Sequence, residues 1–107
     1  MFLYTNIGTT LCFLFLATSL SAHEVNLNTH NLAPYSTYID GKISGTAVEV
    51  LRCTEKKLEY TAFNISVYPW KRAQHMVKSH AADGFFAASQ SAERDEYAVM
   101  SNIIAEQ

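Results

Sequence analysis

The stretch PWKRAQHMVKSHAADGFFAASQSAER, residues 69–94, decides the fold that the sequence predicts. Pro69 suits the first turn of a helix, where a backbone N–H would have no partner inside the helix. The side chains expected on the buried face of this helix recur at helical spacing: Trp70, Ala73, Met76 or Val77, and His80. The run Gly84 to Ala88 carries no charge, as in a strand buried on both faces of a sheet. A helix leading into such a strand is a repeating unit of parallel α/β sheets.

Upstream segments show the same alternation of strand and helix. Residues 25–29 alternate apolar and polar side chains, and 59–67 are rich in β-branched and aromatic residues, so both predict strands. Between them, 46–58 predicts an amphipathic helix with Thr46 as its N-cap. The apolar face of that helix is expected to comprise Ala47, Val50, Leu51, Thr54 and Leu58. The loop before it contains Asp40-Gly41, a pair typical of a short hairpin.

The order of elements predicts where a ligand would bind. Residues 91–96 predict a single helical turn and 97–104 a further strand. Together the segments predict an α/β fold with a parallel sheet and right-handed crossovers. Ligands of such sheets bind beyond the carboxyl ends of the strands, near the topological switch point. A strand that ends at Ala88 would bring Ser89 and Arg94 to that edge.

Arg94 is the first candidate for ligand contact. A guanidinium held just past a strand end, near backbone amides and a hydroxyl, suits a bidentate interaction with a carboxylate. The alternative is a solvated charged turn, SAERDE, in which Arg94 pairs with a neighbouring Glu or Asp. Spacing alone leaves both interpretations open.

Two aromatic residues are further candidates. Tyr35 follows Pro34 in the loop after the first predicted strand, where a stiff backbone could present the ring to a ligand. Trp70 could line the same crevice. A tryptophan at the start of an amphipathic helix is, however, more often a core or boundary residue.

Other kinds of chemistry find little support in the sequence. The four histidines, two of them five residues apart, do not form a helical metal pair, and no zinc pattern is present. No GxSxG nucleophile motif or phosphate-binding loop occurs. Eight basic against ten acidic residues give a net charge of −2, without the clustered basic face of a nucleic-acid-binding protein. We therefore expect a non-enzymatic protein without metal or cofactor.

The N-terminus has the order of a secretory signal peptide. LCFLFLATSL, residues 11–20, is an apolar run too short to span a membrane, and small residues follow it. We predict a signal peptide over 1–22, cleaved after Ala22, a mature domain over 23–107, and a periplasmic location.

Cys53 is then the single cysteine of the mature chain and cannot form an internal disulfide. It is expected to be a small buried residue on a helix, or alternatively a reactive or cross-linking thiol.

Three pieces of the mature chain, in order, carry a resemblance to a known family. They are LAPYSTYIDGKISGTAVEVL (32–51), VYPWKRAQHMVKSHAADGFFAAS (67–89) and SAERDEYAVMS (91–101). They look like an opening loop with its acidic-Gly turn and first helix, a second helix with its strand, and an arginine segment. In this order they resemble the family 3 extracellular solute-binding proteins, the periplasmic amino-acid receptors of ABC transporters.

This resemblance implies a receptor whose two lobes close around a small ligand, an amino acid or related carboxylate, and deliver it to a transporter permease. Arg94 would hold the ligand carboxylate, Ser89 would donate beside it, and Tyr35 would form an aromatic wall. Members of the family are more than twice as long, so the chain is expected to be truncated and to correspond to part of the first lobe. The alternatives are a sensor or lytic-enzyme-linked solute-binding domain, or a non-functional gene fragment.

Overall fold

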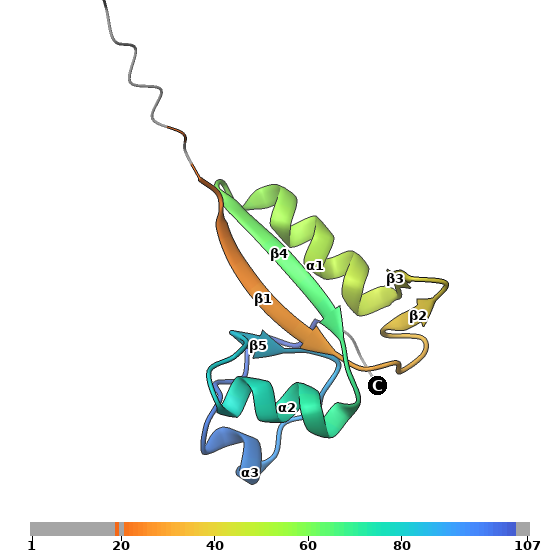
Figure 1. Cartoon of the computed structure of the whole chain (residues 1–107), viewed down its shortest axis with the longest axis vertical. Helices are drawn as coiled ribbons and strands as arrows, with labels where there is room; N and C mark the ends of the chain where they lie inside the picture. Colours follow the sequence, from red (N-terminus) through yellow and green to blue (C-terminus); the bar gives the residue numbers. More distant parts are fainter. Residues whose placement is uncertain (1–18, 20, 105–107) are drawn as a thin grey trace, which may run out of the picture.

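In the computed structural model, residue 19 and residues 21–104 are described. The predicted signal peptide lies almost entirely outside them and stays a prediction. The described chain is a mixed α/β structure built on a parallel sheet, with a small antiparallel hairpin beside it (Figure 1). In chain order its elements are β1 (His23–Thr29), β2 (Thr37–Ile39), β3 (Lys42–Ser44), α1 (Thr46–Lys57), β4 (Thr61–Val67), α2 (Trp70–Lys78), β5 (Gly84–Phe85) and α3 (Ala92–Asp95).

The first strand, β1, is the centre of the sheet. The strand order is β4-β1-β5, and both pairings are parallel, as the sequence predicted. Pairing with β4 runs the full length of β1, from His23 opposite Thr61 to Thr29 opposite Val67. Pairing with β5 covers only Leu27 opposite Gly84 and Asn28 opposite Phe85. The chain therefore leaves β1 for one neighbour and later crosses back to the other side.

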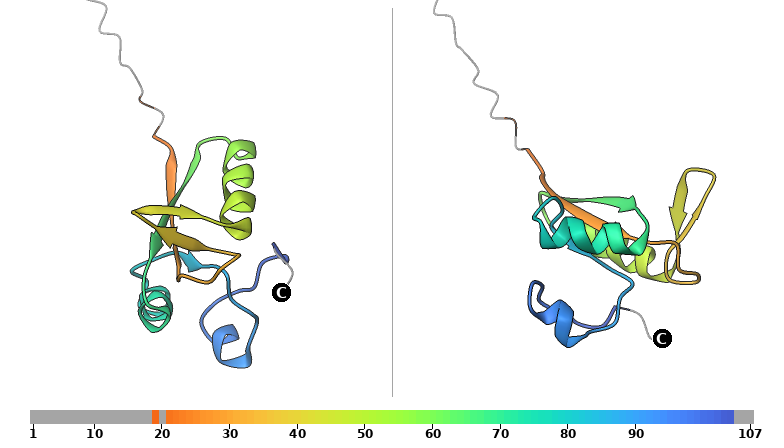
Figure 2. Two further views of the ribbon diagram at one scale, coloured as in Figure 1. Left: turned by 90° about the vertical axis from the view of Figure 1, so that its right-hand side faces the viewer. Right: turned by 60° about the horizontal axis from the view of Figure 1, so that its bottom comes forward.

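Because the two crossovers run in opposite directions across the sheet, right-handed connections place their helices on opposite faces. Figure 2 shows this arrangement, with α1 on one side of the strands and α2 on the other. Among the described residues, no helix combines the length and apolar character needed to cross a membrane.

The predicted hairpin is present. β2 and β3 pair antiparallel around Asp40 and Gly41, which have φ values of 50° and 76°. Two successive positive φ values are those of the turn that matches the twist of a hairpin. The Asp-Gly pair accommodates them because glycine has no Cβ and aspartate tolerates the left-handed region.

α1 begins differently from the prediction. Thr46 is the first residue of the helix and not its N-cap, which is Gly45. The N–H groups of Thr46 and Ala47 donate to the carbonyls of Pro34 and Tyr35, at 3.1 and 3.0 Å. These loop carbonyls satisfy donors that a capping side chain would otherwise serve. The loop after β1, in which the Ala33–Pro34 peptide bond is cis, is thereby joined to the start of α1.

The buried side of α1 is also shifted relative to the prediction. Ala47 and Val48 are buried and form the core with Phe86 of the segment after β5. Val50 and Leu58 are exposed, and so is Cys53, which was wrongly expected to be buried. A helix that packs on a narrow sheet buries only a thin stripe, so apolar residues beside that stripe remain in solvent.

α2 follows its predicted pattern up to its last turn. Pro69 stands immediately before the helix, and Ala73 and Val77 are buried. His80 was wrongly placed on the buried face, because the helix ends at Lys78 and His80 is exposed with φ of 63°. That left-handed conformation turns the chain towards β5.

The C-terminal part contains the largest correction. β5 covers two residues, where a strand through Ala88 was predicted, and Ala87 has φ of 58°, which ends the extended conformation. Residues 97–104 were predicted as a strand, but the structure contains none there. A strand needs a neighbouring backbone to pair with, and the short β5 offers little. Ile104 packs partly on the core, whereas Val99 is 98% exposed.

Candidate ligand-binding site

The candidate site lies where β1 and β5 end, at the carboxyl edge of the sheet. In a sheet of order β4-β1-β5 this is the topological switch point, where a crevice opens between diverging connections. Two hydrogen bonds join the chain ends that leave the strands. Thr29 Oγ1 donates to the carbonyl of Phe86 at 3.3 Å, and His30 Nε2 lies 3.3 Å from the carbonyl of Ala87. The floor of the crevice is thus fixed by bonds between the two strand ends.

A group of aromatic side chains covers one side of this edge. The ring of His30 stacks on that of Trp70, with centroids 4.4 Å apart and planes 27° from parallel. Phe85 meets Trp70 edge to face at 5.2 Å, and Tyr97 lies 6.3 Å beyond Phe85. Trp70 is half-buried and belongs to the boundary between core and crevice. Its ring is held on two sides by residues from other elements.

Arg94 lies over this aromatic group. Its guanidinium carbon is 5.4 Å from the centroid of Trp70, a cation–π arrangement. Nε donates to Oε1 of Gln74 at 3.3 Å, and Nη1 donates to the carbonyl of Ser89. The backbone N–H of Arg94 donates to Oγ of Ser91, which caps the single turn α3. Three contacts, two from α2 and one from the segment after β5, therefore fix this side chain.

The guanidinium of Arg94 forms no ion pair within the described part of the chain. Asp95, its neighbour, accepts instead from Nε2 of Gln90, at 3.1 and 3.3 Å. Among the described residues the ion pair found is Arg52 with Glu55, and none accepts a hydrogen bond from Nη2 of Arg94. The alternative expectation, an arginine paired with acidic residues of its own turn, is therefore not the arrangement observed.

Ser89, Arg94 and Tyr35 line one wide cavity of about 1050 Å³. Its lining combines polar side chains such as Ser89 and Arg94 with apolar ones such as Leu51 and Phe86. Tyr35 is half-buried and packs against the core cluster. Trp70 is not among the residues that line this cavity and supports Arg94 from beneath. The structure thus brings Ser89, Trp70 and Arg94 into one cluster, and Tyr35 shares only the cavity.

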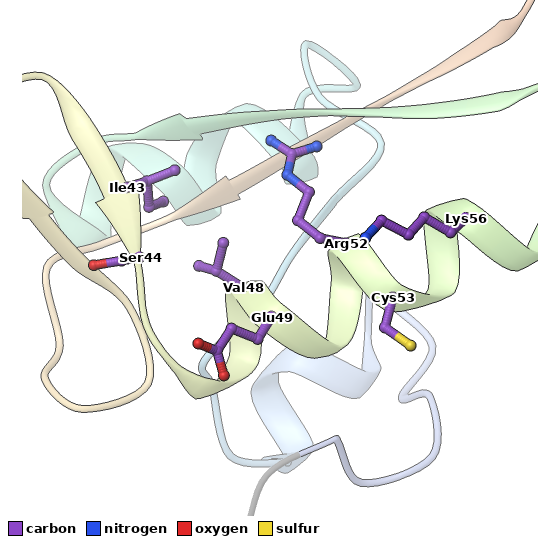
Figure 3. Close-up of a pocket in the computed structure, with 7 residues that line it drawn as sticks. All are labelled: Ile43, Ser44, Val48, Glu49, Arg52, Cys53 and Lys56. Atoms are coloured by element: carbon purple, nitrogen blue, oxygen red, sulfur yellow. The ribbon is translucent and has the colours of Figure 1, made fainter.

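A second, shallower hollow of about 420 Å³ lies on α1 and β3 (Figure 3). Its lining includes Glu49, Cys53 and Lys56. Arg52, also in the lining, donates to Glu55 and to the carbonyl of Phe63, so it ties α1 to β4. Within residue 19 and residues 21–104, no group of three histidine, cysteine or acidic side chains could hold a metal ion.

Sequence reasoning missed two members of the site. Gln74 stands four residues after Trp70, one helical turn on, and this spacing alone would have placed both on the same face of α2. His30 is the first residue after β1, so the rule that ligands lie beyond strand ends points to it as well. Neither signal indicates that the two residues contact Arg94 and Trp70.

Comparison with known proteins adds no family to this description, since no family model matches the chain and no curated protein shows significant similarity to it.

Proposed function

We propose that this chain is a lobe of an exported solute-binding protein, in which Arg94 binds the carboxylate of a small ligand such as an amino acid. The proposal rests on the position and the contacts of the Arg94 guanidinium. It lies at the carboxyl edge of a parallel sheet, fixed on Trp70 and by neutral acceptors, with no acidic partner among the described residues. A rigid guanidinium with an uncompensated charge is suited to a carboxylate.

The wider arrangement agrees with this role. The parallel sheet with a helix on each face is compatible with a lobe of a receptor of the resembled family, and Ser89 lies beside Arg94. β1 begins at His23, so cleavage after Ala22 on export to the periplasm would leave the whole strand in the mature protein. The transporter permease would be the partner that receives the ligand.

Titration of the purified protein with a panel of small carboxylates tests the proposal. The panel comprises the L-amino acids, acetate, lactate, succinate and citrate, and binding is measured by calorimetry. Trp70 is the only tryptophan, so its emission gives an independent signal from directly beneath Arg94. A single lobe leaves one side of the ligand in water, so we expect a dissociation constant of about 1 mM, equivalent to about 4 kcal/mol.

Substitutions of two arginines make the test specific. Arg94→Ala removes a charge-assisted hydrogen bond worth about 1.5–3 kcal/mol, so affinity should fall at least tenfold. The matched control is Arg72→Ala, because Arg72 lies over the ring of Tyr68 at 4.9 Å and does not line the cavity. If Arg94→Ala binds the same carboxylate as well as the wild-type protein does, the assignment of Arg94 is wrong.

A further inference from the structure

The chain contains two arginines whose guanidinium groups are anchored in contrasting ways. Arg52 donates from Nη1 to the carboxylate of Glu55 at 3.1 Å and to the carbonyl of Phe63 at 2.8 Å. Its charge is compensated by an ion pair, and its role is to join α1 to β4. Arg94 is anchored as firmly, but its acceptors are a side-chain amide and a backbone carbonyl, and its support is an indole ring.

Gln74 is the side chain responsible for this difference. It projects from α2, is half-buried, and accepts from Nε of Arg94. A guanidinium can only donate hydrogen bonds, so the amide must present its oxygen to it. This bond fixes the Nε edge, and Nη1 is held by the carbonyl of Ser89. Together these two hydrogen bonds fix the orientation of the guanidinium over the indole ring of Trp70.

A glutamate would make the same hydrogen bond with nearly the same shape, but its negative charge would compensate that of Arg94. A bound carboxylate would then have to compete with a permanent intramolecular partner. An amide supplies the geometry without the charge.

We propose that Gln74 is a positioning residue that holds Arg94 against Trp70 while leaving its positive charge available to a ligand carboxylate. This inference rests on the proposed function and adds to it the residue that sets the affinity of the site. Gln74 acts through Arg94 and does not itself line the cavity.

The test compares Gln74→Glu and Gln74→Met with the wild type in the full chain. The probe is the best-bound carboxylate of the panel above, and each variant's melting temperature is measured by circular dichroism. Gln74→Glu should melt at or above the wild-type temperature yet bind the carboxylate about tenfold more weakly, because an ion pair replaces a neutral hydrogen bond. Gln74→Met, similar in length without a strong acceptor, should lower affinity by a smaller factor.

The decisive result is a fall in affinity without a fall in melting temperature in Gln74→Glu, since the loss of a merely structural glutamine would lower both together or neither. The control is Glu55→Gln, the reverse exchange at Arg52, which should lower the melting temperature and leave affinity unchanged. Wild-type affinity in Gln74→Glu overturns the inference and leaves the proposed function standing. Should that variant not fold, wild-type affinity in Gln74→Met overturns the inference equally. A wild-type protein that binds no member of the panel refutes the proposed function, and the inference with it.

Discussion

Replacing Gly45 with alanine tests how the start of α1 is joined to the loop after β1. Gly45 has φ of 124° and ψ of 166°, a region that essentially only glycine occupies. A Cβ at this position would lie 2.4 Å from the carbonyl oxygen of Tyr35 and 2.8 Å from that of Pro34. Those same oxygens accept the N–H groups of Thr46 and Ala47. The loop and the helix therefore cannot both keep their positions in the variant.

The expected cost follows from these contacts. Backbone strain of this kind costs about 1–3 kcal/mol. Loss of the two hydrogen bonds adds about 0.5–1.5 kcal/mol each. We expect Gly45→Ala to lower the free energy of unfolding by about 2–6 kcal/mol, a large share of the about 5–15 kcal/mol typical of a whole domain.

Urea denaturation followed by Trp70 emission and far-ultraviolet circular dichroism measures this change. The control is Gly41→Ala, since Gly41 also has a positive φ, 76°, but a Cβ there would meet nothing within 4 Å. It should cost about 1–2 kcal/mol, from the left-handed conformation alone. If the two variants lose equal stability, the close approach of Gly45 to Tyr35 does not hold the start of α1, and the reasoning is refuted.

Three further predictions concern the core, the cysteine and export. Phe86→Ala should destabilise the fold by about 3–5 kcal/mol in thermal melts, because Phe86 is only 7% exposed and central to the core; a loss below about 1 kcal/mol would contradict this packing. Cys53→Ser should change stability by less than about 0.5 kcal/mol, and the native thiol should react with a disulfide reagent as fast as in urea, since Cys53 is exposed; slow reaction would indicate burial. Mass spectrometry of protein recovered from the periplasm should find His23, or a neighbour within a residue or two, at the N-terminus; recovery with Met1 intact would argue against a cleaved signal peptide.

Local sequence signals predicted the elements whose conformation depends on their own residues. The Asp40-Gly41 turn, the two long helices and the single helical turn α3 are of this kind. Apolar periodicity also predicted the type of sheet, since strand–helix alternation allows few other arrangements. It could not locate the buried stripe of α1 closely, because the width of the sheet beneath a helix is not a local property.

The candidate site was predicted only in part, for a related reason. The rule on strand ends placed Ser89 and Arg94 at the edge of the sheet. Two of the contacts that orient Arg94, those with Gln74 and Trp70, join residues 20 or more positions apart, and no spacing rule predicts them. The strand predicted over 97–104 was wrong for a similar reason. A high β-propensity shows that a segment can form a strand, and it does not show that a neighbouring strand is present.

The central place of β1 has a consequence for how the chain folds. Among the described strands, β1 is the first to leave a ribosome or a translocation channel, and both of its neighbours in the sheet, β4 and β5, come much later in the chain. Asn26 forms a hydrogen bond with Asn64, 38 residues later in the chain, and Thr29 forms one with Phe86, 57 residues later. Non-local pairing of this kind slows folding, because a long loop must close before any contact stabilises it. Until residue 61 is available, both edges of β1 are unpaired. The emerging chain is therefore most prone to aggregation during this stage.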